Sequence, residues 1–373
     1  MNRKVILAIA IAAVVIGAGA ATVFLMSRSQ KSNVVYYVTV SPVSNMKGSL
    51  ASGSIDGFIS WEPFDSDAVV GGVGQVLEWS SDIMPNHPCC VVVASTDYTS
   101  TELGRDVTVH FVKAHVEATT WILNALSDKT SANYQLLLQL GAQFTGRNET
   151  VLKMALDHVK YGYQMDAAFV GGITNFTQDF IDGGVVAADK LQAGGYDNVT
   201  DFVGKYTNKT YLASAATIEQ VDHYLNPDNA VRVGFLGSDL HQLAEWVAQN
   251  KTVGGGSHSL FDKYGVKVTN ASLTGYTSGP NEMSAFAAGD VDIGYLGCAP
   301  AIQAHLSASV HTVIVAQANS EGSAIIVKAG SGITTIADLK GKTIAVPSTG
   351  AIQFSLLKIA VEKAGMQLEV KVA

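Results

Sequence analysis

The sequence is poor in charge and in cysteine, and it has no long basic run. Charged side chains make up 15% of the 373 residues and hydrophobic ones 47%, which excludes global disorder and allows a large core. The formal net charge is −8, so the basic face that a nucleic-acid partner requires is missing. The three cysteines cannot all pair in one chain, which rules out a fully paired disulfide framework. No Gly-x₄-Gly-Lys-Ser/Thr motif occurs, so the chain does not itself hydrolyse ATP.

One long apolar segment stands at the N-terminus. Residues 5–26 carry no charge and have basic residues on both flanks. A helix of about 20 apolar residues spans the hydrocarbon core, whereas the apolar part of a cleavable signal has roughly 7–15 residues. The pattern therefore favours an uncleaved transmembrane anchor, although the small residues 17–21 keep a cleaved signal open. No cysteine lies near the segment, which excludes a lipoprotein anchor.

Potential glycosylation sites point to the outer face of a membrane. Six Asn-x-Ser/Thr sequons fall in the middle of the chain, at Asn148, Asn175, Asn198, Asn208, Asn250 and Asn270. Because such acceptors are typical of exported surfaces, we expect the protein at the extracytoplasmic face of the cell membrane, or secreted if the first segment is cleaved.

The remaining chain alternates strand and helix patterns. β-branched or apolar runs predict strands near residues 34–40, 55–60, 91–94, 231–236, 266–268, 291–296, 313–316, 324–327 and 343–346. Apolar residues at three- and four-residue spacing predict a helical region over residues 101–225, with further helices near 45–51, 239–249, 282–288 and 352–364. This alternation predicts an α/β fold with largely parallel sheets, which bind ligands at the carboxyl ends of strands.

Several strings then resemble one known family. Residues 286–301, 319–324 and 337–347 are similar to the nitrate/sulfonate/bicarbonate/taurine class of ABC solute-binding proteins, as are residues 53–64 and 87–90. The resemblance covers most of residues 34–373. It implies a two-lobed periplasmic-binding-protein-like fold that closes around a solute by a hinge motion.

The order of these strings departs from the family. Residues 231–373 resemble the segment that comes first in the family, and residues 34–225 the one that follows, so the sequence looks circularly permuted. The alternative is a fragment of a tandem array. The permuted plan implies an anchor and linker at 1–33, one lobe of 34–88 plus 331–373, and a second lobe of 89–330. The crossings near residues 90–94 and 324–328 would form the hinge.

The candidate binding residues follow predicted strands, where small oxyanions are held by N–H and hydroxyl donors at helix N-termini. Each candidate also has a simpler explanation. Ser348 and Thr349 can be ordinary N-cap residues of the following helix. His241, in the first turn of a helix, can be merely exposed, and Trp61 can be a core residue. With the family resemblance, the expected ligand-binding residues are Ser238, Asp239, His241, Gly297, Cys298, Asn319, Glu321, Ser323, Ser348, Thr349, Gln353, Trp61, Glu62 and His87.

Metal binding and thiol catalysis are the weaker interpretations of His87, Cys89, Cys90 and Cys298. Adjacent cysteines fit a tetrahedral zinc site poorly, and nothing in the sequence fixes a base beside a nucleophile. We therefore expect no cofactor, no metal and no catalytic residue, but small buried thiols beside the cleft.

These observations predict binding rather than chemistry. The expected function is the solute-binding component of an ABC importer, which delivers nitrate, bicarbonate, taurine or an alkanesulfonate to a permease and its ATPase. Two alternatives stay open: a thiamine-pyrimidine-precursor binder or synthesising enzyme of the same fold, and a sensory solute-binding ectodomain.

Overall fold

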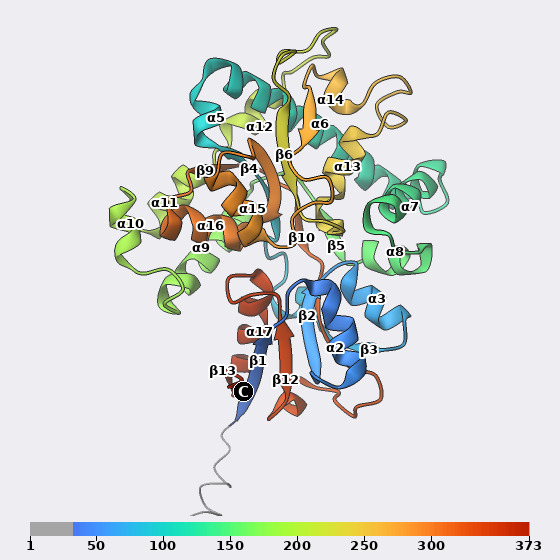
Figure 1. The fold of residues 1–373 in the computed structure, drawn as a ribbon, viewed down its shortest axis with the longest axis vertical. Helices are drawn as coiled ribbons and strands as arrows, with labels where there is room; N and C mark the ends of the chain where they lie inside the picture. The colour runs from blue at the N-terminus through green and yellow to red at the C-terminus, as the bar shows by residue number, and fades with distance from the viewer. Residues whose placement is uncertain (1–32, 373) are drawn as a thin grey trace, which may run out of the picture.

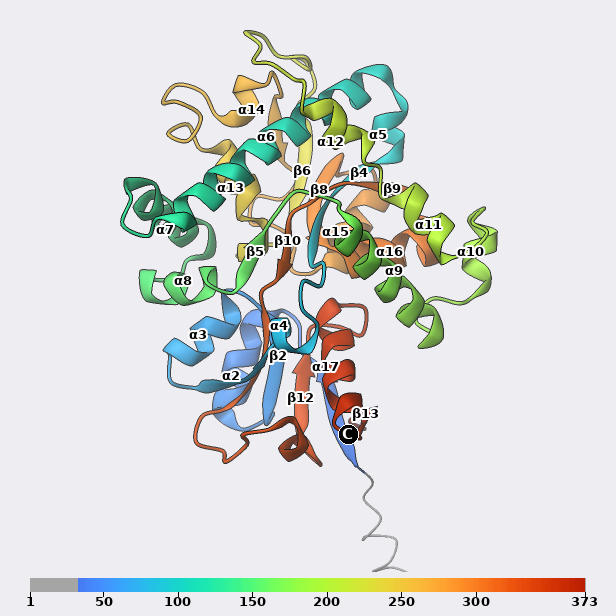
Figure 2. The same cartoon turned by 180° about the vertical axis from the view of Figure 1, so that it is seen from behind.

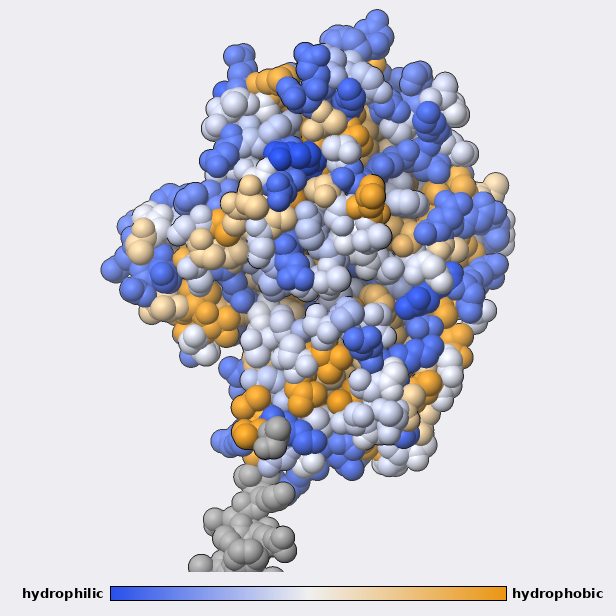
Figure 3. All heavy atoms as spheres, in the orientation of Figure 1, coloured by the Kyte–Doolittle hydropathy of each residue, from blue (hydrophilic) through white to orange (hydrophobic). Residues whose placement is uncertain are grey.

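The computed structural model describes residues 33–372, which form two α/β parts stacked along the long axis of the molecule (Figure 1). Within these residues no helix is both long and apolar enough to cross a membrane. The predicted anchor at residues 5–26 lies outside the described residues. The surface in Figure 3 shows hydrophobic residues in scattered patches, which is usual for protein surfaces.

The first part contains both ends of the described chain in one six-stranded sheet. Its order is β13-β1-β12-β2-β11-β3. The strands are β1 (Val34–Thr39), β2 (Gly57–Trp61), β3 (Gly74–Trp79), β11 (Ser323–Lys328), β12 (Thr343–Val346) and β13 (Gln367–Val370). The helices packed around them are α2 (Met46–Ser52), α3 (Phe64–Val70), α4 (Ser80–Ile83) and α17 (Ile352–Lys363), with short 3₁₀ turns η1 (Val43–Asn45) and η3 (Ile336–Leu339).

Both faces of this sheet are buried, because successive strand residues point to opposite sides. In β2, Phe58 packs into the cluster formed with α2 and α3, whereas Ile59 packs into the cluster that includes α17. Ile326 and Ile325 of β11 divide between the two clusters in the same way. The apolar runs predicted as strands therefore belong to a sheet that is covered by helices on both faces.

The second part is built on a five-stranded sheet with the order β7-β6-β8-β4-β9. Its strands are β4 (Cys90–Ser95), β6 (Val231–Phe235), β7 (Val268–Asn270), β8 (Ile293–Gly297) and β9 (Thr312–Gln317). Its helices are α5 (Thr96–Ser100), α6 (Glu102–Ser127), α7 (Ala132–Thr145), α8 (Glu149–Leu156), α9 (Ala167–Asp182), α10 (Asp189–Ala193), α11 (Val199–Tyr206), α12 (Thr210–Ala215), η2 (Leu240–Gln242), α13 (Leu243–Gln249), α14 (Leu260–Lys263), α15 (Gly279–Ala287) and α16 (Cys298–Ala308). The long helix α6 packs against α12, α13 and α14, as the two views of Figures 1 and 2 show.

The expectation of largely parallel sheets is wrong. Five strand pairings are parallel and five are antiparallel. The antiparallel ones all involve β4, β11 or the small pair β5 (Val159–Tyr161) and β10 (Asn319–Glu321). β4 and β11 are the strands that enter each sheet directly after the chain has crossed from the other part, so they run against their neighbours.

The chain crosses between the two sheets twice. One crossing joins α4 to β4, and the other joins β9 to β11 through β10. Because β11 belongs to the six-stranded sheet, the boundary between the sheets falls near Gly322 rather than at residue 330. The crossing segments lie side by side, since Cys89 N–H donates to the Asn319 carbonyl at 3.1 Å.

Most predicted elements are present, with shifted ends. The helical pattern near residue 151 ends at Leu156, and Val159 instead begins strand β5. The sequence interpretation missed β3, which is half-buried and lacks a continuous apolar run. The early strand β1 lies between β12 and the edge strand β13 and is parallel to both.

Candidate functional site

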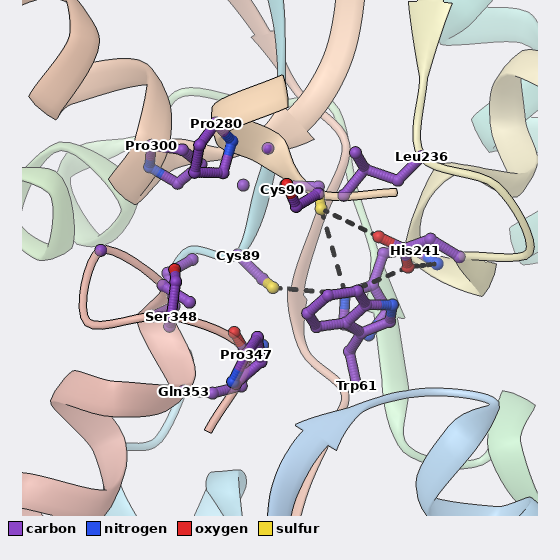
Figure 4. A pocket seen from close by; sticks show the side chains of 17 residues that line it. Trp61, Cys89, Cys90, Leu236, His241, Pro280, Pro300, Pro347, Ser348 and Gln353 are labelled. Atoms are coloured by element: carbon purple, nitrogen blue, oxygen red, sulfur yellow. Dashed lines mark hydrogen bonds and ion pairs between the residues drawn. The ribbon is translucent and has the colours of Figure 1, made fainter. Parts of the chain in front are cut away.

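A cavity of about 40 Å³ lies between the two sheets, and we call it the inter-sheet cavity (Figure 4). It is lined by Trp61, Cys89, Cys90, Leu236, Asp239, His241, Ser278, Gly279, Pro280, Gly297, Pro300, Pro347, Ser348, Gly350, Ala351, Ile352 and Gln353. Both sheets supply residues from the carboxyl ends of their parallel strands, the usual ligand position in such folds. β2 ends at Trp61, β12 just before Pro347, and β6 just before Leu236.

Six of the expected binding residues meet at this cavity. They are Trp61, Asp239, His241, Gly297, Ser348 and Gln353. They come from four stretches of chain that are far apart in sequence, and what they share is their place after a strand. The prediction that they bind a ligand stays a prediction, because this arrangement shows only that they lie together.

Trp61 contributes a large, nearly buried ring to the wall. Its side chain is 8% exposed and packs edge-to-face on Phe64, with ring centroids 6.2 Å apart. Its indole Nε1 is buried without a hydrogen-bond partner among the described residues. Because a buried N–H usually finds an acceptor, this donor is free for a bound group.

Two helix N-termini, one from each part, open on the same cavity. No side chain of the described residues caps α16 after Gly297 or α17 after Ala351. Unpaired N–H groups at such ends, together with the helix dipole, favour negative charge. In α16 the Cys298 N–H already donates to the Cys89 carbonyl at 2.8 Å and Pro300 has no N–H, so α17 offers the freer donors. Gln353 in the first turn of α17 donates from Nε2 to Ser323 Oγ at 3.0 Å. Gln303 of α16 donates to the Gly350 carbonyl at 3.0 Å and so ties the two parts together across the cavity.

The opposite wall holds two thiols, an imidazole and a carboxylate. The Cys89 Sγ lies 3.2 Å from His241 Nδ1, and the Cys90 Sγ lies 4.0 Å from the same nitrogen and from Asp239 Oδ2. Cys89, Cys90 and His241 are the three side chains whose ligand atoms all lie within 4.8 Å of one another. This trio could hold a metal ion. The sequence interpretation had set aside a metal site made of His87, Cys89, Cys90 and Cys298, and it did not include His241.

Burial and mutual charge shift the pKa values in this wall. Burial raises the pKa of Asp239 from 3.8 to about 7. For His241, burial lowers the pKa, but the Cys89 thiolate and the Asp239 carboxylate raise it further, to about 10. A hydrogen bond from Cys90 and the charge of His241 hold the pKa of Cys89 well below its usual range. The thiolate of Cys89 paired with a charged imidazole is therefore the favoured state.

Three expected binding residues instead brace the crossing segments. Asn319 Oδ1 accepts the N–H of Cys90 at 2.9 Å. Glu321 accepts the N–H of Asn86 at 2.7 Å and pairs with Lys160 at 2.8 Å. His87 is 1% exposed and has its Nδ1 at 3.1 Å from the Pro88 carbonyl.

The other five expected residues do not line the cavity. Glu62 is fully buried and accepts from the Ser66 hydroxyl at 2.7 Å, and burial raises its pKa to about 7. Cys298 is buried behind the wall, Ser238 has a left-handed backbone with φ of 62°, and Thr349 is exposed. Ser323 reaches the site only through its hydrogen bond with Gln353.

The sequence interpretation missed the apolar wall of the cavity. Leu236, Pro280, Pro300, Pro347 and Ile352 make much of the surface. Their only sequence signal is a position just after a strand or at the start of a helix, which many residues share. Cys89 and Cys90 were expected as small buried thiols beside the cleft, and both are buried and line the cavity.

Comparisons with known proteins match separate parts of the chain. The profile of the NMT1-like family matches residues 17–136. The profile of the ABC transporter, phosphonate, periplasmic substrate-binding protein matches residues 265–370. No solved structure shows a significant match.

The curated relatives also align with only part of the chain. Putative binding proteins of Brucella abortus (strain 2308) and of Brucella suis biovar 1 (strain 1330) are 34% identical over 162 residues, which is 43% of this chain and 46% of theirs. The chain therefore spans about half the length of the curated relatives it matches. Together with the mixed α/β fold, these matches support a solute-binding protein of the periplasmic, ABC-transporter kind.

Proposed function

We propose that this protein is the extracytoplasmic solute-binding component of an ABC importer, which captures a small solute between two lobes and delivers it to a permease. The observation that carries the proposal is the inter-sheet cavity, because its lining comes from both sheets at the carboxyl ends of their strands. The periplasmic-family matches at 17–136 and 265–370 support the same role. The N-terminal segment, as an anchor, would hold the binding domain near its permease.

The two sheets would be the cores of the two lobes, and the two crossings would be the hinge. A cavity of about 40 Å³ has room for about three water molecules, at roughly 10–15 Å³ each. A solute of taurine size requires the lobes to separate and close again, as hinged binding proteins do. The circular permutation remains our proposal for the reversed order of the family segments, supported by β1 lying beside β13 in one sheet.

The ligand class that fits the wall best is a small organic anion of the sulfonate or taurine type. The uncapped N-terminus of α17, the Ser348 hydroxyl and the free Trp61 Nε1 are donors for an oxyanion. The proline and leucine side chains around them suit an apolar carbon chain better than they suit bare nitrate or bicarbonate. A thiamine-pyrimidine compound, which the sequence resemblance left open, is the second candidate.

A thermal-shift screen tests this proposal. The protein is melted with taurine, alkanesulfonates, nitrate, bicarbonate and thiamine-pyrimidine compounds. A true ligand at about 100 times its dissociation constant adds about 2.7 kcal/mol to the free energy of unfolding. Cooperative melting with no shift from any of these compounds would refute the proposed solute class.

A pair of neighbouring variants then tests the site. Ser348→Ala removes a cavity donor and should weaken solute binding by about 1–3 kcal/mol. Thr349→Ala changes an exposed residue outside the lining and should leave affinity unchanged. Equal effects of the two substitutions would show that the loop does not bind the solute in this way.

A further inference from the structure

Three metal-ligand atoms converge in the wall of the inter-sheet cavity. The Sγ atoms of Cys89 and Cys90 and a ring nitrogen of His241 lie within 4.8 Å of one another, and each side chain is 2% exposed or less. Figure 4 draws a dashed line from each sulfur atom toward the area behind the Trp61 ring, and the shared partner of both is His241 Nδ1. Two thiols and an imidazole are a soft donor set, which suits Zn²⁺ and excludes Mg²⁺ or Ca²⁺.

The orientation of His241 is that of a metal-bound histidine. Its Nε2 lies 2.8 Å from the Gly322 carbonyl oxygen. A carbonyl only accepts, so Nε2 carries a hydrogen. When metal binding removes the other ring proton, the lone pair is left on Nδ1, which faces the thiols. Metal-binding histidines commonly donate their other N–H to a backbone carbonyl in this way. Gly322 permits the contact, because a Cβ there would lie 2.3 Å from Nε2.

The distances suit tetrahedral coordination. Zn–S bonds of about 2.3 Å and Zn–N bonds of about 2.0 Å at tetrahedral angles place a sulfur and a nitrogen ligand about 3.5 Å apart. The two measured separations from His241 Nδ1 are 3.2 Å to Cys89 Sγ and 4.0 Å to Cys90 Sγ, on either side of that value. Small side-chain rotations would bring both to it.

Two adjacent cysteines within one strand would point to opposite faces of the sheet, but Cys89 and Cys90 do not both lie in a strand. Successive residues of a strand face opposite sides, but Cys90 is the first residue of β4 and Cys89 precedes it in the crossing segment. Their sulfur atoms consequently fall on the same side, within 4.8 Å.

Asp239 is a neighbour of the trio and not one of its ligands. Its Oδ1 accepts the N–H of His241 at 3.0 Å, and its Oδ2 accepts from Gln242 Nε2 at 3.1 Å. Both carboxylate oxygens of Asp239 therefore hold the turn over residues 239–242, and the carboxylate lies beside the trio. Cys89, Cys90 and His241 all line the inter-sheet cavity, so an open fourth coordination position would face it, where a water or a solute atom fits.

We propose that Cys89, Cys90 and His241 bind one divalent ion of the Zn²⁺ class, with the fourth coordination position open to the inter-sheet cavity. Two protons pass to solvent on binding, one from the Cys90 thiol and one from the hydrogen-bonded Cys89–His241 pair, so that two thiolates balance the charge of the ion. Three protein ligands with one open position is the arrangement in which zinc binds an exchangeable water or substrate group. The ion would therefore be an additional anchor for any anionic solute.

Cobalt titration of the purified, chelator-treated protein under anaerobic conditions tests the site. We expect one Co²⁺ per chain, with sulfur-to-cobalt charge-transfer absorption that Zn²⁺ displaces. Cys89→Ser and Cys90→Ser should each reduce that absorption and weaken metal affinity by about 100-fold or more, beyond the 10–100-fold typical of outer-shell changes. The matched control is Cys298→Ser, which alters a buried cysteine outside the trio and should retain the spectrum.

Absence of the absorption from the wild-type protein, or its survival in both Cys89→Ser and Cys90→Ser, overturns the proposal. X-ray absorption of the Zn²⁺-loaded wild-type protein needs no variant, and it must show two sulfur ligands at about 2.3 Å. Running the solute screen with and without chelator separates the two proposals. Solute binding without any metal binding leaves the solute role intact and refutes the metal site alone.

Discussion

Replacing Glu245 by Gln should make the protein more stable at neutral and alkaline pH. Glu245 lies on α13 and is fully buried. One carboxylate oxygen accepts from Gln249, and the other has no partner among the described residues. Burial raises the pKa of Glu245 from 4.5 to about 7. The carboxyl group is therefore more costly to ionise in the folded chain than in the unfolded one.

The sign and size of the effect follow from proton linkage. Between pH 4.5 and about 7 the folded state binds more protons at this group than the unfolded state, so the free energy of unfolding falls as pH rises through that window. At about 1.4 kcal/mol per pKa unit, the cost above pH 7 is about 3 kcal/mol. Glu245→Gln keeps the shape and removes the ionisation. The variant should therefore match the wild type near pH 4 and exceed its stability by up to about 3 kcal/mol at pH 8.

Urea unfolding at pH 4, 6 and 8 measures this difference. The control is Glu219→Gln, which changes an exposed carboxylate and should shift stability equally little at every pH. The reasoning fails if Glu245→Gln is no more stable than the wild type at pH 8, or if its advantage does not shrink toward pH 4.

Two further perturbations probe the cavity. The ring of Trp61 lines the cavity and is 8% exposed, so solute binding should change the tryptophan fluorescence. The Trp61→Phe variant should lose that change. An identical fluorescence response from the variant would place Trp61 away from the solute. Gly322→Ala adds a Cβ 2.3 Å from His241 Nε2 at a residue with φ of 82°. It should therefore lower the free energy of unfolding by about 1–3 kcal/mol and weaken Co²⁺ binding. A wild-type melting curve with unchanged cobalt affinity would contradict both the clash and the role of this contact.

The sequence predicts the fold where local pattern and burial agree. The apolar run around Val92 is a strand with no exposed side chains, and the helical spacing around Phe111 belongs to the 26-residue helix α6. Strand direction could not be read in the same way, because it depends on the point at which the chain crosses between sheets. The short strand β5 was missed because three residues give no period, and it pairs with a partner more than 150 residues away.

The site is predictable as far as it depends on the ends of strands. Trp61, Gly297 and Ser348 lie at the cavity because strands β2, β8 and β12 end there. Asn319 and Glu321 follow the same pattern but turn toward backbone N–H groups of the crossing segment. Packing decides which backbone N–H groups are left unpaired, and this decides whether a polar side chain hydrogen-bonds to the backbone or faces the cavity. Sequence spacing carries no information on which N–H groups are left unpaired.

Buried acidic groups near His241 connect the stability of this protein with its site. Glu62, Asp65 and Asp239 are each 2% exposed or less, burial raises the pKa of each, and in each case the positive charge of His241 acts in the opposite direction. Such groups cost stability when they ionise, and strongly shifted acids occur most often where a ligand or reaction uses them. Zinc binding to Cys89, Cys90 and His241 displaces two protons, so its stabilising effect grows as the pH rises. The same ion that anchors an anionic solute would then also stabilise the walls of the cavity, so loading with Zn²⁺ should raise the melting temperature of the wild type more at pH 8 than at pH 5.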